Sequence, residues 1–243
     1  GKVFRIGRLA DKTCVEGFGL RAMKDTVFLE ELRCDGAAHD GCQRGCMIFW
    51  KTAWLEPVAG SQPSAPEASS PLPLKTRDGT KYHCQSTALM SATQRLPVFG
   101  VPQLLTEVKR RELSLWHFAL MVGRAALNKL RAALGFTDIG IINGSDKQAS
   151  RGDLNLAPGE WVRIKTPVEL KSVLDSKGRN RGLLFEPDML AYTGGNFQVS
   201  HRVDRIIHEE TGRMVELKGT VALKGVACRG FCSKNCPRNN YFY

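Results

Sequence analysis

The sequence contains no apolar run that approaches the roughly 18 consecutive residues needed for a membrane-spanning helix. Residues Gly1 to Ala10 lack the apolar core of a secretory signal peptide. The chain also has no P-loop, no Gly-x-Gly-x-x-Gly and no Gly-x-Ser-x-Gly motif, so nucleotide binding and serine hydrolysis lack support. We therefore expect a soluble, cytoplasmic protein without a membrane span.

Acidic residues are too few to balance the basic ones. The 243 residues include 35 Lys and Arg against 24 Asp and Glu, which gives a formal net charge of +11. Such an excess attracts polyanions, so nucleic acid, an acidic protein or an anionic membrane surface is a candidate partner, although charge alone does not choose among them. A hydrophobic fraction of 42% is enough for a core, and the length allows one large domain or two of about 100 residues.

Eight cysteines are many for a cytoplasmic protein of this length. Because reducing compartments disfavour structural disulfides, such a set indicates metal ligation or redox chemistry. The Cys-x2-Cys knuckle that is typical of zinc ribbons is missing. The cysteines instead gather near the two ends of the chain.

An internal repeat relates these two ends. The segment Thr26–Cys34 aligns with Thr220–Cys228, with Thr, Val, Leu and Cys identical. With a one-residue slip, Phe4–Ile6 aligns with Phe197–Val199. The residues before Phe197 have no counterpart before Phe4. The first copy is therefore truncated, or it lacks residues upstream, or its strands complete another sheet.

The pattern predicts an α+β, β-rich fold with two related SH3-like barrel units joined by a helical connector. A short strand is expected at Glu160–Ile164, and the capping box at Thr166–Glu169 predicts a helix that runs to about Leu174. Ser114 is expected to cap a longer helix with one apolar face. The predicted regions are a first metal-binding repeat at 1–59, a flexible Ser/Pro-rich linker at 60–80, the helical connector at 81–150 and the second repeat at 151–243.

The eight cysteines divide into two groups of four, the number that a zinc ion or a cubane cluster requires. The first cluster contains Cys34, Cys42 and Cys46, and the second contains Cys228, Cys232 and Cys236. The two remaining thiols, Cys14 and Cys84, complete the groups. The sequence leaves open which of them joins which group, and His39 or His83 could replace either.

The spacing of the cysteines favours iron–sulfur over zinc. Cysteines separated by three residues set thiols wider apart than a zinc knuckle does, and Cys236-Pro237 repeats the ending of ferredoxin-type runs. Gly41 and Gly45 precede their cysteines, which leaves backbone N–H groups near sulfur. We expect one or two clusters, of the 4Fe-4S type, with zinc, disulfides and unligated thiols as the alternatives.

The resulting hypothesis is an iron–sulfur protein with redox or Lewis-acid chemistry, either an enzyme or an electron-transfer partner. It would act on a small-molecule substrate or a redox partner protein. Asp35, His39 and Asp40 lie in the first cysteine loop and are the candidates for acid–base catalysis. The alternative is a zinc-stapled, basic, SH3-like module that binds nucleic acid or an acidic partner without catalysis.

Overall fold

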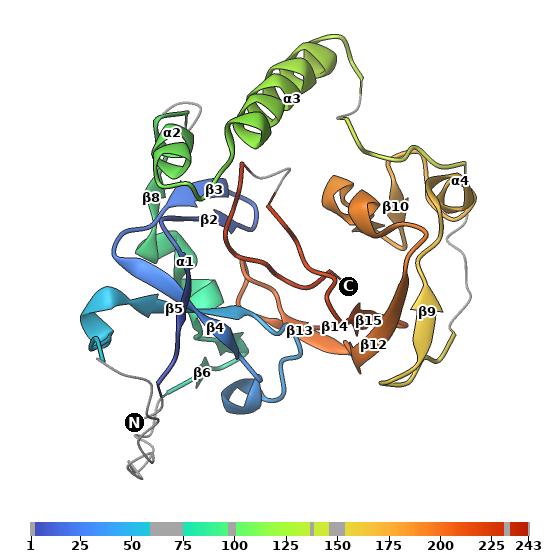
Figure 1. Cartoon of the computed structure of the whole chain (residues 1–243). Coiled ribbons are helices and arrows are strands. Elements are labelled where there is room, and N and C mark those ends of the chain that lie inside the picture. The colour runs from blue at the N-terminus through green and yellow to red at the C-terminus, as the bar shows by residue number, and fades with distance from the viewer. Residues whose placement is uncertain are drawn as a thin grey trace. The chain divides into compact units, whose positions relative to one another are not determined.

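The computed structural model describes residues 3–58, 75–96, 101–136, 139–145, 154–230 and 234–242 (Figure 1). The fold is mixed α+β, with many short strands and few helices. None of the helices in these ranges has the length and apolar character required to cross a membrane. The predicted linker at 60–80 lies mostly outside the described residues.

The strands are β1 (Ile6–Leu9), β2 (Lys12–Val15), β3 (Gly19–Ala22), β4 (Thr26–Arg33), β5 (Met47–Lys51), β6 (Arg77–Asp78), β7 (Lys81–Tyr82), β8 (Gln94–Arg95), β9 (Trp161–Arg163), β10 (Arg179–Asn180), β11 (Leu183–Leu184), β12 (Asn196–Arg202), β13 (Arg205–Ile207), β14 (Met214–Glu216) and β15 (Val221–Leu223). The α-helices are α1 (Gln85–Ala92), α2 (Val101–Lys109), α3 (Leu115–Ala133) and α4 (Pro167–Leu170), and the 3₁₀ helices are η1 (Ala37–His39), η2 (Thr52–Trp54) and η4 (Pro187–Tyr192).

The chain divides into two compact units, and each is assembled from segments that are distant in sequence. Unit 1 comprises Gly1–Leu96, Val203–Lys218 and Cys236–Asn240. Unit 2 comprises Pro97–Arg202, Gly219–Asn235 and Tyr241–Tyr243. Parts of the second sequence copy therefore belong to unit 1.

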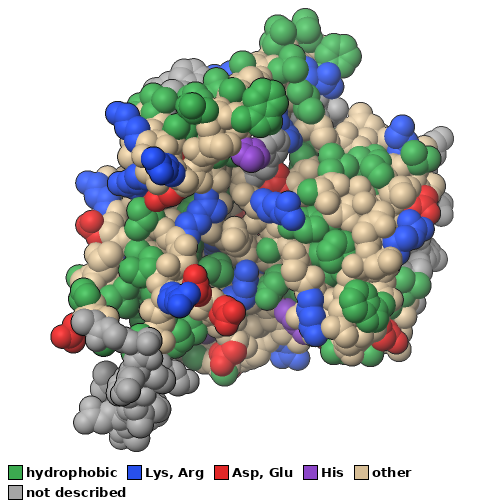
Figure 2. Space-filling model, in the orientation of Figure 1, with side chains coloured by type: hydrophobic (Ala, Val, Ile, Leu, Met, Phe, Trp, Pro, Cys, Tyr) green, Lys and Arg blue, Asp and Glu red, His purple; other side chains and the backbone are tan. Residues whose placement is uncertain are grey.

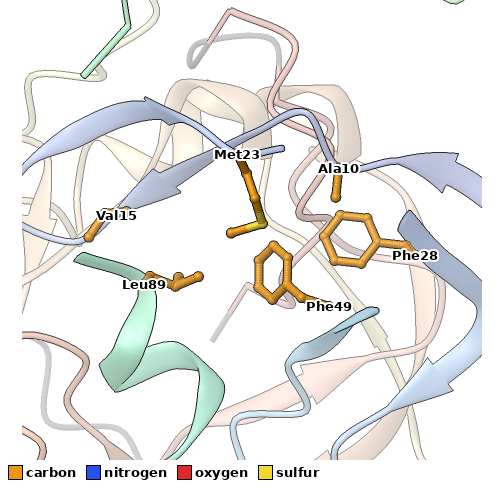
Figure 3. Packing of buried hydrophobic residues seen from close by; sticks show 6 residues of the cluster. All are labelled: Ala10, Val15, Met23, Phe28, Phe49 and Leu89. Atoms are coloured by element: carbon orange, nitrogen blue, oxygen red, sulfur yellow. The ribbon is translucent and has the colours of Figure 1, made fainter. Parts of the chain in front are cut away.

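Unit 1 contains the sheets β1-β4-β5, β2-β3-β8, β6-β7 and β13-β14. Its core is a set of buried apolar side chains from these strands, from residues that directly follow them and from α1: Ala10, Val15, Met23, Phe28, Phe49 and Leu89. Figure 3 shows Met23, Phe28 and Phe49 pointing toward one another, with Leu89 of α1 beside them. The rings of Phe28 and Phe49 have centroids 4.8 Å apart. This tilted packing joins β4 to β5, the two strands that flank the first cysteine loop.

Unit 2 contains the sheets β15-β12-β9 and β10-β11. Its sheet packs on Tyr192, Val226 and Phe242, whereas Leu104, Leu113 and Met121 form a separate small core between α2 and α3. The described strands of the chain form sheets of only two or three strands, and no closed barrel is found among them. The SH3-like barrels therefore stay a prediction.

The aligned segments of the two copies have the same strand pairing. In unit 1, β1 pairs antiparallel with β4, Ile6 lies opposite Leu29, and a bulge follows. In unit 2, β12 pairs antiparallel with β15, Val199 lies opposite Leu223, and a bulge follows at the same place. The one-residue slip in the sequence alignment lies between the first and the second strand of each pair, so the pairing register is the same in both copies.

The hairpins that follow are also equivalent. The hairpin β2-β3 places Cys14 opposite Leu20, and the hairpin β13-β14 places Ile207 opposite Met214, which are the aligned positions. At the base of the cysteine loops, the backbone of Arg33 pairs with that of Met47 in one copy, and the backbone of Ala227 pairs with that of Tyr241 in the other. The repeat thus extends through the cysteine loops, and Cys42 corresponds to Cys236.

The predicted helix starts are confirmed. The Ser114 hydroxyl accepts the His117 amide hydrogen at the start of α3, and Thr166 and Glu169 form the capping box of α4. The helix α4 ends at Leu170, four residues earlier than expected, and turns continue to Leu174. Most of the apolar face expected on α3 is exposed. The helix buries Met121, and Phe118 of the expected face is half-buried against the same small core.

Candidate metal centre

Four cysteines line one cavity of about 170 Å3 in unit 1. The other lining residues are His39, Arg44, Gly45, Met47, Ile48, Gln85, Ser86 and Ile207. The four cysteines are Cys34, Cys42, Cys46 and Cys84. The cavity therefore collects the whole first cluster of the sequence and adds Cys84, a thiol that lies far beyond that cluster in the chain.

Three segments of the chain supply these thiols. Cys34 directly follows β4, Cys42 and Cys46 lie in the loop before β5, and Cys84 is the N-cap residue of α1. The first residue of the helix fixes it to β5, because the Gln85 side chain pairs with the backbone of Phe49 through two hydrogen bonds of 2.8 Å. The contact between α1 and β5 thereby brings Cys84 to the cysteine loop, although the two are distant in sequence.

The loop folds back on itself at Gly36. Its φ of +73° favours glycine, and a Cβ at this position would collide with the backbone carbonyl of Cys42. The Gly36 carbonyl accepts hydrogen bonds from the amides of His39 and Gly41, at 2.9 and 3.1 Å. The Cys34 amide donates to the Cys46 carbonyl at 2.9 Å, which closes the base of the loop.

Hydrogen-bond donors surround the sulfur atoms. The Ile207 amide donates to Cys42 Sγ at 3.4 Å. The Ser86 hydroxyl lies 3.3 Å from Cys46 Sγ, and it accepts a 2.9 Å hydrogen bond from the buried guanidinium of Arg238. Such contacts stabilise negative charge on a thiolate and tune a metal that it binds.

The electrostatics at Cys34 disfavour a bare thiolate. Burial raises the pKa of the Cys34 thiol, a backbone hydrogen bond from Gly36 opposes this shift, and the nearby thiols of Cys46 and Cys42 and the carboxylate of Asp35 raise the pKa further. Thiols that repel one another as anions hold protons until a cation replaces them. The arrangement is thus suited to binding a cation with release of protons.

His39 lies at the cavity with one nitrogen already engaged. Its Nε2 is 3.1 Å from the His83 carbonyl, so this nitrogen donates and Nδ1 is left as the acceptor or ligand atom. His39 is the last residue of η1, inside the cysteine loop. Of the three catalytic candidates from the sequence, Asp35, His39 and Asp40, His39 is the one that lines the cavity.

The two carboxylates of the loop accept hydrogen bonds, one from the loop backbone and one from side chains. Asp35 Oδ1 accepts a 3.0 Å hydrogen bond from the Ala37 amide. Asp40 Oδ2 accepts hydrogen bonds from the Tyr82 hydroxyl at 2.7 Å and from Arg77 at 3.0 Å, and these donors, the tyrosine first, lower the pKa of the Asp40 carboxyl. Neither Asp35 nor Asp40 is among the residues that line the cavity.

Cys14, which the sequence groups with the first cluster or the second, lies beside Cys236. The Cys14 amide donates to Cys236 Sγ at 3.2 Å. This contact is the repeat equivalent of the hydrogen bond from Ile207 to Cys42, because Cys14 aligns with Ile207 and Cys236 aligns with Cys42. Each cysteine loop therefore places a sulfur on the hairpin of the other copy.

Two arginines repeat this exchange. Arg44 donates to the Ile207 carbonyl at 3.0 Å, and Arg238, its aligned equivalent, donates to the Cys14 carbonyl at 3.1 Å. Both guanidinium groups pair with the buried carboxylate of Glu209, at 3.5 and 2.7 Å. Reciprocal contacts of this kind are the signature of an isologous, two-fold arrangement, here inside unit 1.

The rest of the second cluster is less defined. Cys228 belongs to unit 2, where its thiol lies 3.6 Å from Asp188 Oδ2 and its sulfur accepts the Gly230 amide at 3.4 Å. Cys232 lies outside the described residues. None of the seven described cysteines forms a disulfide, namely Cys14, Cys34, Cys42, Cys46, Cys84, Cys228 and Cys236. In the described ranges, no group of three or more His, Cys, Asp or Glu side chains is already arranged to hold a metal ion.

Comparisons of this chain with protein-family models, with curated proteins and with solved structures find no match. The candidate site consequently depends on its own geometry.

Sequence reasoning missed Gln85 and Ser86 as lining residues, and it missed Arg44 and Arg238. The two arginines did carry a signal, since each stands two residues after an aligned cysteine, Cys42 or Cys236.

Proposed function

We propose that unit 1 carries a thiolate-ligated metal centre, an iron–sulfur cluster, with Cys34, Cys42, Cys46 and Cys84 as its ligands. The observation that supports this proposal is the cavity that these four cysteines share. Four cysteine ligands are the usual complement of an iron–sulfur cluster. The cluster would supply electron-transfer or Lewis-acid chemistry, and the chain would act as a redox protein or an enzyme.

The size of the cavity favours a cluster over a single ion. Its volume of about 170 Å3 is roughly ten times the 10–15 Å3 that a cavity needs to hold one water molecule. A zinc ion requires four ligand atoms at about 2.3 Å from one point, whereas the irons of a cluster occupy separate corners and accept thiolates that stand further apart. The side chains would still have to turn inward on loading, since they do not yet form an ion site.

Access to the centre would lie on the side of Cys84. Cys84 and Gln85 also line a second cavity of about 430 Å3, together with His83, Thr87, Ala88 and Ser91. A small-molecule substrate or a redox partner protein would approach through this cavity. On the inner side, the apolar side chains of Met47 and Ile48 would limit contact with water, and limited solvent access is one of the factors that set a cluster potential.

The seven free thiols are consistent with a reducing compartment, so we keep the cytoplasm as the proposed location. A second centre at Cys228, Cys232 and Cys236 and the SH3-like form of the two units stay predictions from the sequence. They carry no part of the proposal for unit 1.

The proposal is tested by purifying the full chain without oxygen. We expect a brown protein with broad visible absorption that bleaches on reduction, and with iron and acid-labile sulfide in comparable amounts. A colourless protein that holds zinc would overturn the iron–sulfur centre. It would favour the non-catalytic, basic binding module instead, provided that its affinity for nucleic acid falls steeply with salt.

A further inference from the structure

The helix α3 of unit 2 exposes a broad apolar face. Its large apolar residues on this face are Leu115, Trp116, Leu120, Val122, Leu127 and Leu130. Leu115 is 72% exposed, Trp116 70% and Leu130 57%, whereas a side chain in a protein core would be nearly inaccessible. Hydrophobic side chains gather over this helix in the space-filling view (Figure 2). Exposed apolar surface on this scale marks an interaction site.

These residues occupy one continuous side of the helix. With 3.6 residues per turn, the positions from Val122 through Leu115 and Trp116 to Leu120 cover an arc of roughly 160°. The residues between them on this arc are alanine and glycine, and every residue of the arc is exposed. Met121 lies on the opposite side, where it packs with Leu104 and Leu113. The helix is therefore held from behind, and its apolar face is directed away from its own support.

Only basic residues border the apolar face. The helix contains no Asp or Glu. On the helical wheel, Lys129 lies at one margin of the arc, and Arg124 and Arg131 lie at the other. The Arg131 guanidinium lies over the Phe136 ring at 5.5 Å, and Arg124 donates to the Ile139 carbonyl at 2.8 Å. Arg124 also lines the cavity on the supported side of the helix with Met121, so Lys129 and Arg131 are the cations that border the apolar face most closely.

Among the residues that the structure describes, the acidic groups near the helix lie away from this face. Glu107 is a buried residue of α2 that accepts a hydrogen bond from Asn235. Glu112 precedes α3, and with Asp188 it lines a cavity on the supported side of the helix beside Met121. Past the end of α3, Leu134 and Phe136 extend the exposed apolar surface, at 64% and 60% exposure. A tryptophan at one end, an aromatic at the other and cations along both margins are the features of a helix that lies in a membrane interface.

We propose that α3 docks unit 2 in the plane of an anionic lipid surface. The apolar face would enter the boundary between headgroups and acyl chains, and Lys129 and Arg131 would lie against lipid phosphates. The cationic margins select this occupant over a second copy of the chain, because two such helices would bring like charges together. The helix does not meet the requirements for crossing the bilayer, so the contact is peripheral. This proposal is independent of the metal centre.

The test is sedimentation of the full chain with vesicles of phosphatidylcholine, with or without phosphatidylglycerol. We expect binding to the anionic vesicles, weaker binding to the neutral ones, and release at high salt. The substitution Trp116→Ser should weaken binding at least about tenfold, from the apolar area it removes. Trp161→Ser is the matched control, since Trp161 is 71% exposed on β9 of the same unit, and it should leave binding unchanged. Lys129→Gln should cost about fivefold on anionic vesicles.

Three results would overturn the proposal. The first is that the chain fails to sediment with anionic vesicles. The second is that Trp116→Ser and Trp161→Ser bind the vesicles equally. The third is that sedimentation equilibrium shows a dimer that Trp116→Ser dissociates, which would assign the face to a second copy of the chain. Circular dichroism of each variant establishes that α3 is retained, so a loss of binding is not a loss of folding.

Discussion

Glu16 and Glu209 exchange hydrogen bonds: the Glu16 amide donates to the Glu209 carboxylate at 3.1 Å, and the Glu209 amide donates to the Glu16 carboxylate at 3.3 Å. The two residues are aligned in the repeat. Their exchange lies at the centre of the reciprocal contacts that Arg44 and Arg238 make in unit 1. The symmetry is incomplete, however, because Arg44 reaches both carboxylates, with Glu16 also at 3.5 Å.

The two glutamates differ in burial, so we expect their substitution to lower the free energy of unfolding by different amounts. The Glu209 side chain is 2% exposed and pairs with both arginines, whereas the Glu16 side chain is 42% exposed. Glu209→Gln leaves the guanidinium of Arg238 buried without its carboxylate, and it leaves Arg44 with the half-exposed carboxylate of Glu16, so it should lower the free energy of unfolding by about 3–5 kcal/mol. Glu16→Gln should cost about 1 kcal/mol or less. Urea denaturation of both variants measures the difference, and equal costs would contradict the assigned role of Glu209.

Gly36 and Gly41 provide a second matched pair. Both have a φ of +73°, but an added Cβ at Gly36 meets the Cys42 carbonyl and one at Gly41 meets open space. Gly41→Ala should cost about 1–2 kcal/mol, from the left-handed backbone alone. Gly36→Ala should cost clearly more and should displace Cys42 from the cavity, which we would detect as faster alkylation of that thiol. Equal stability of the two variants would show that the loop does not close as described.

Local chemistry made parts of the fold predictable. The caps at Ser114 and Thr166 were readable because a side-chain oxygen and a nearby backbone amide suffice for each. The aligned segments of the sequence likewise indicated that the two copies contain equivalent strands. The burial of α3 was not readable, because an apolar face has the same pattern whether it meets a protein core or an external surface. The assignment of Cys14 and Cys84 to a group also stayed open.

The placement of Cys84 shows why the site was only half predictable. Cys34, Cys42 and Cys46 share one loop, so their proximity follows from a short chain length. Cys84 reaches them through the pairing of Gln85 with Phe49, 36 residues away. No spacing rule encodes a contact of that kind, since it depends on how α1 packs against β5.

Tyr82 holds the Asp40 carboxylate at the edge of the cysteine loop. Its hydroxyl is the first cause of the lowered pKa of Asp40, and Arg77 is a further cause. A lowered folded-state pKa stabilises the fold above the unfolded pKa of about 3.9, and that contribution is lost as the pH falls through the folded pKa. Tyr82→Phe should raise the pKa of Asp40 and reduce this acid-dependent loss. NMR titration measures the pKa of Asp40 in both proteins. Asp175 is the control, because backbone amides of Arg179 and Lys177, and not a tyrosine, lower its pKa.

The metal content of two single-cysteine variants tests the central claim most directly. Cys84 lines the cavity with Cys34, Cys42 and Cys46, whereas Cys14 lies beside Cys236. After purification without oxygen, Cys84→Ser should lose most of the iron and the visible absorption of the intact protein, and Cys14→Ser should keep both. A Cys84→Ser variant that retains full iron and colour would contradict the four-cysteine centre.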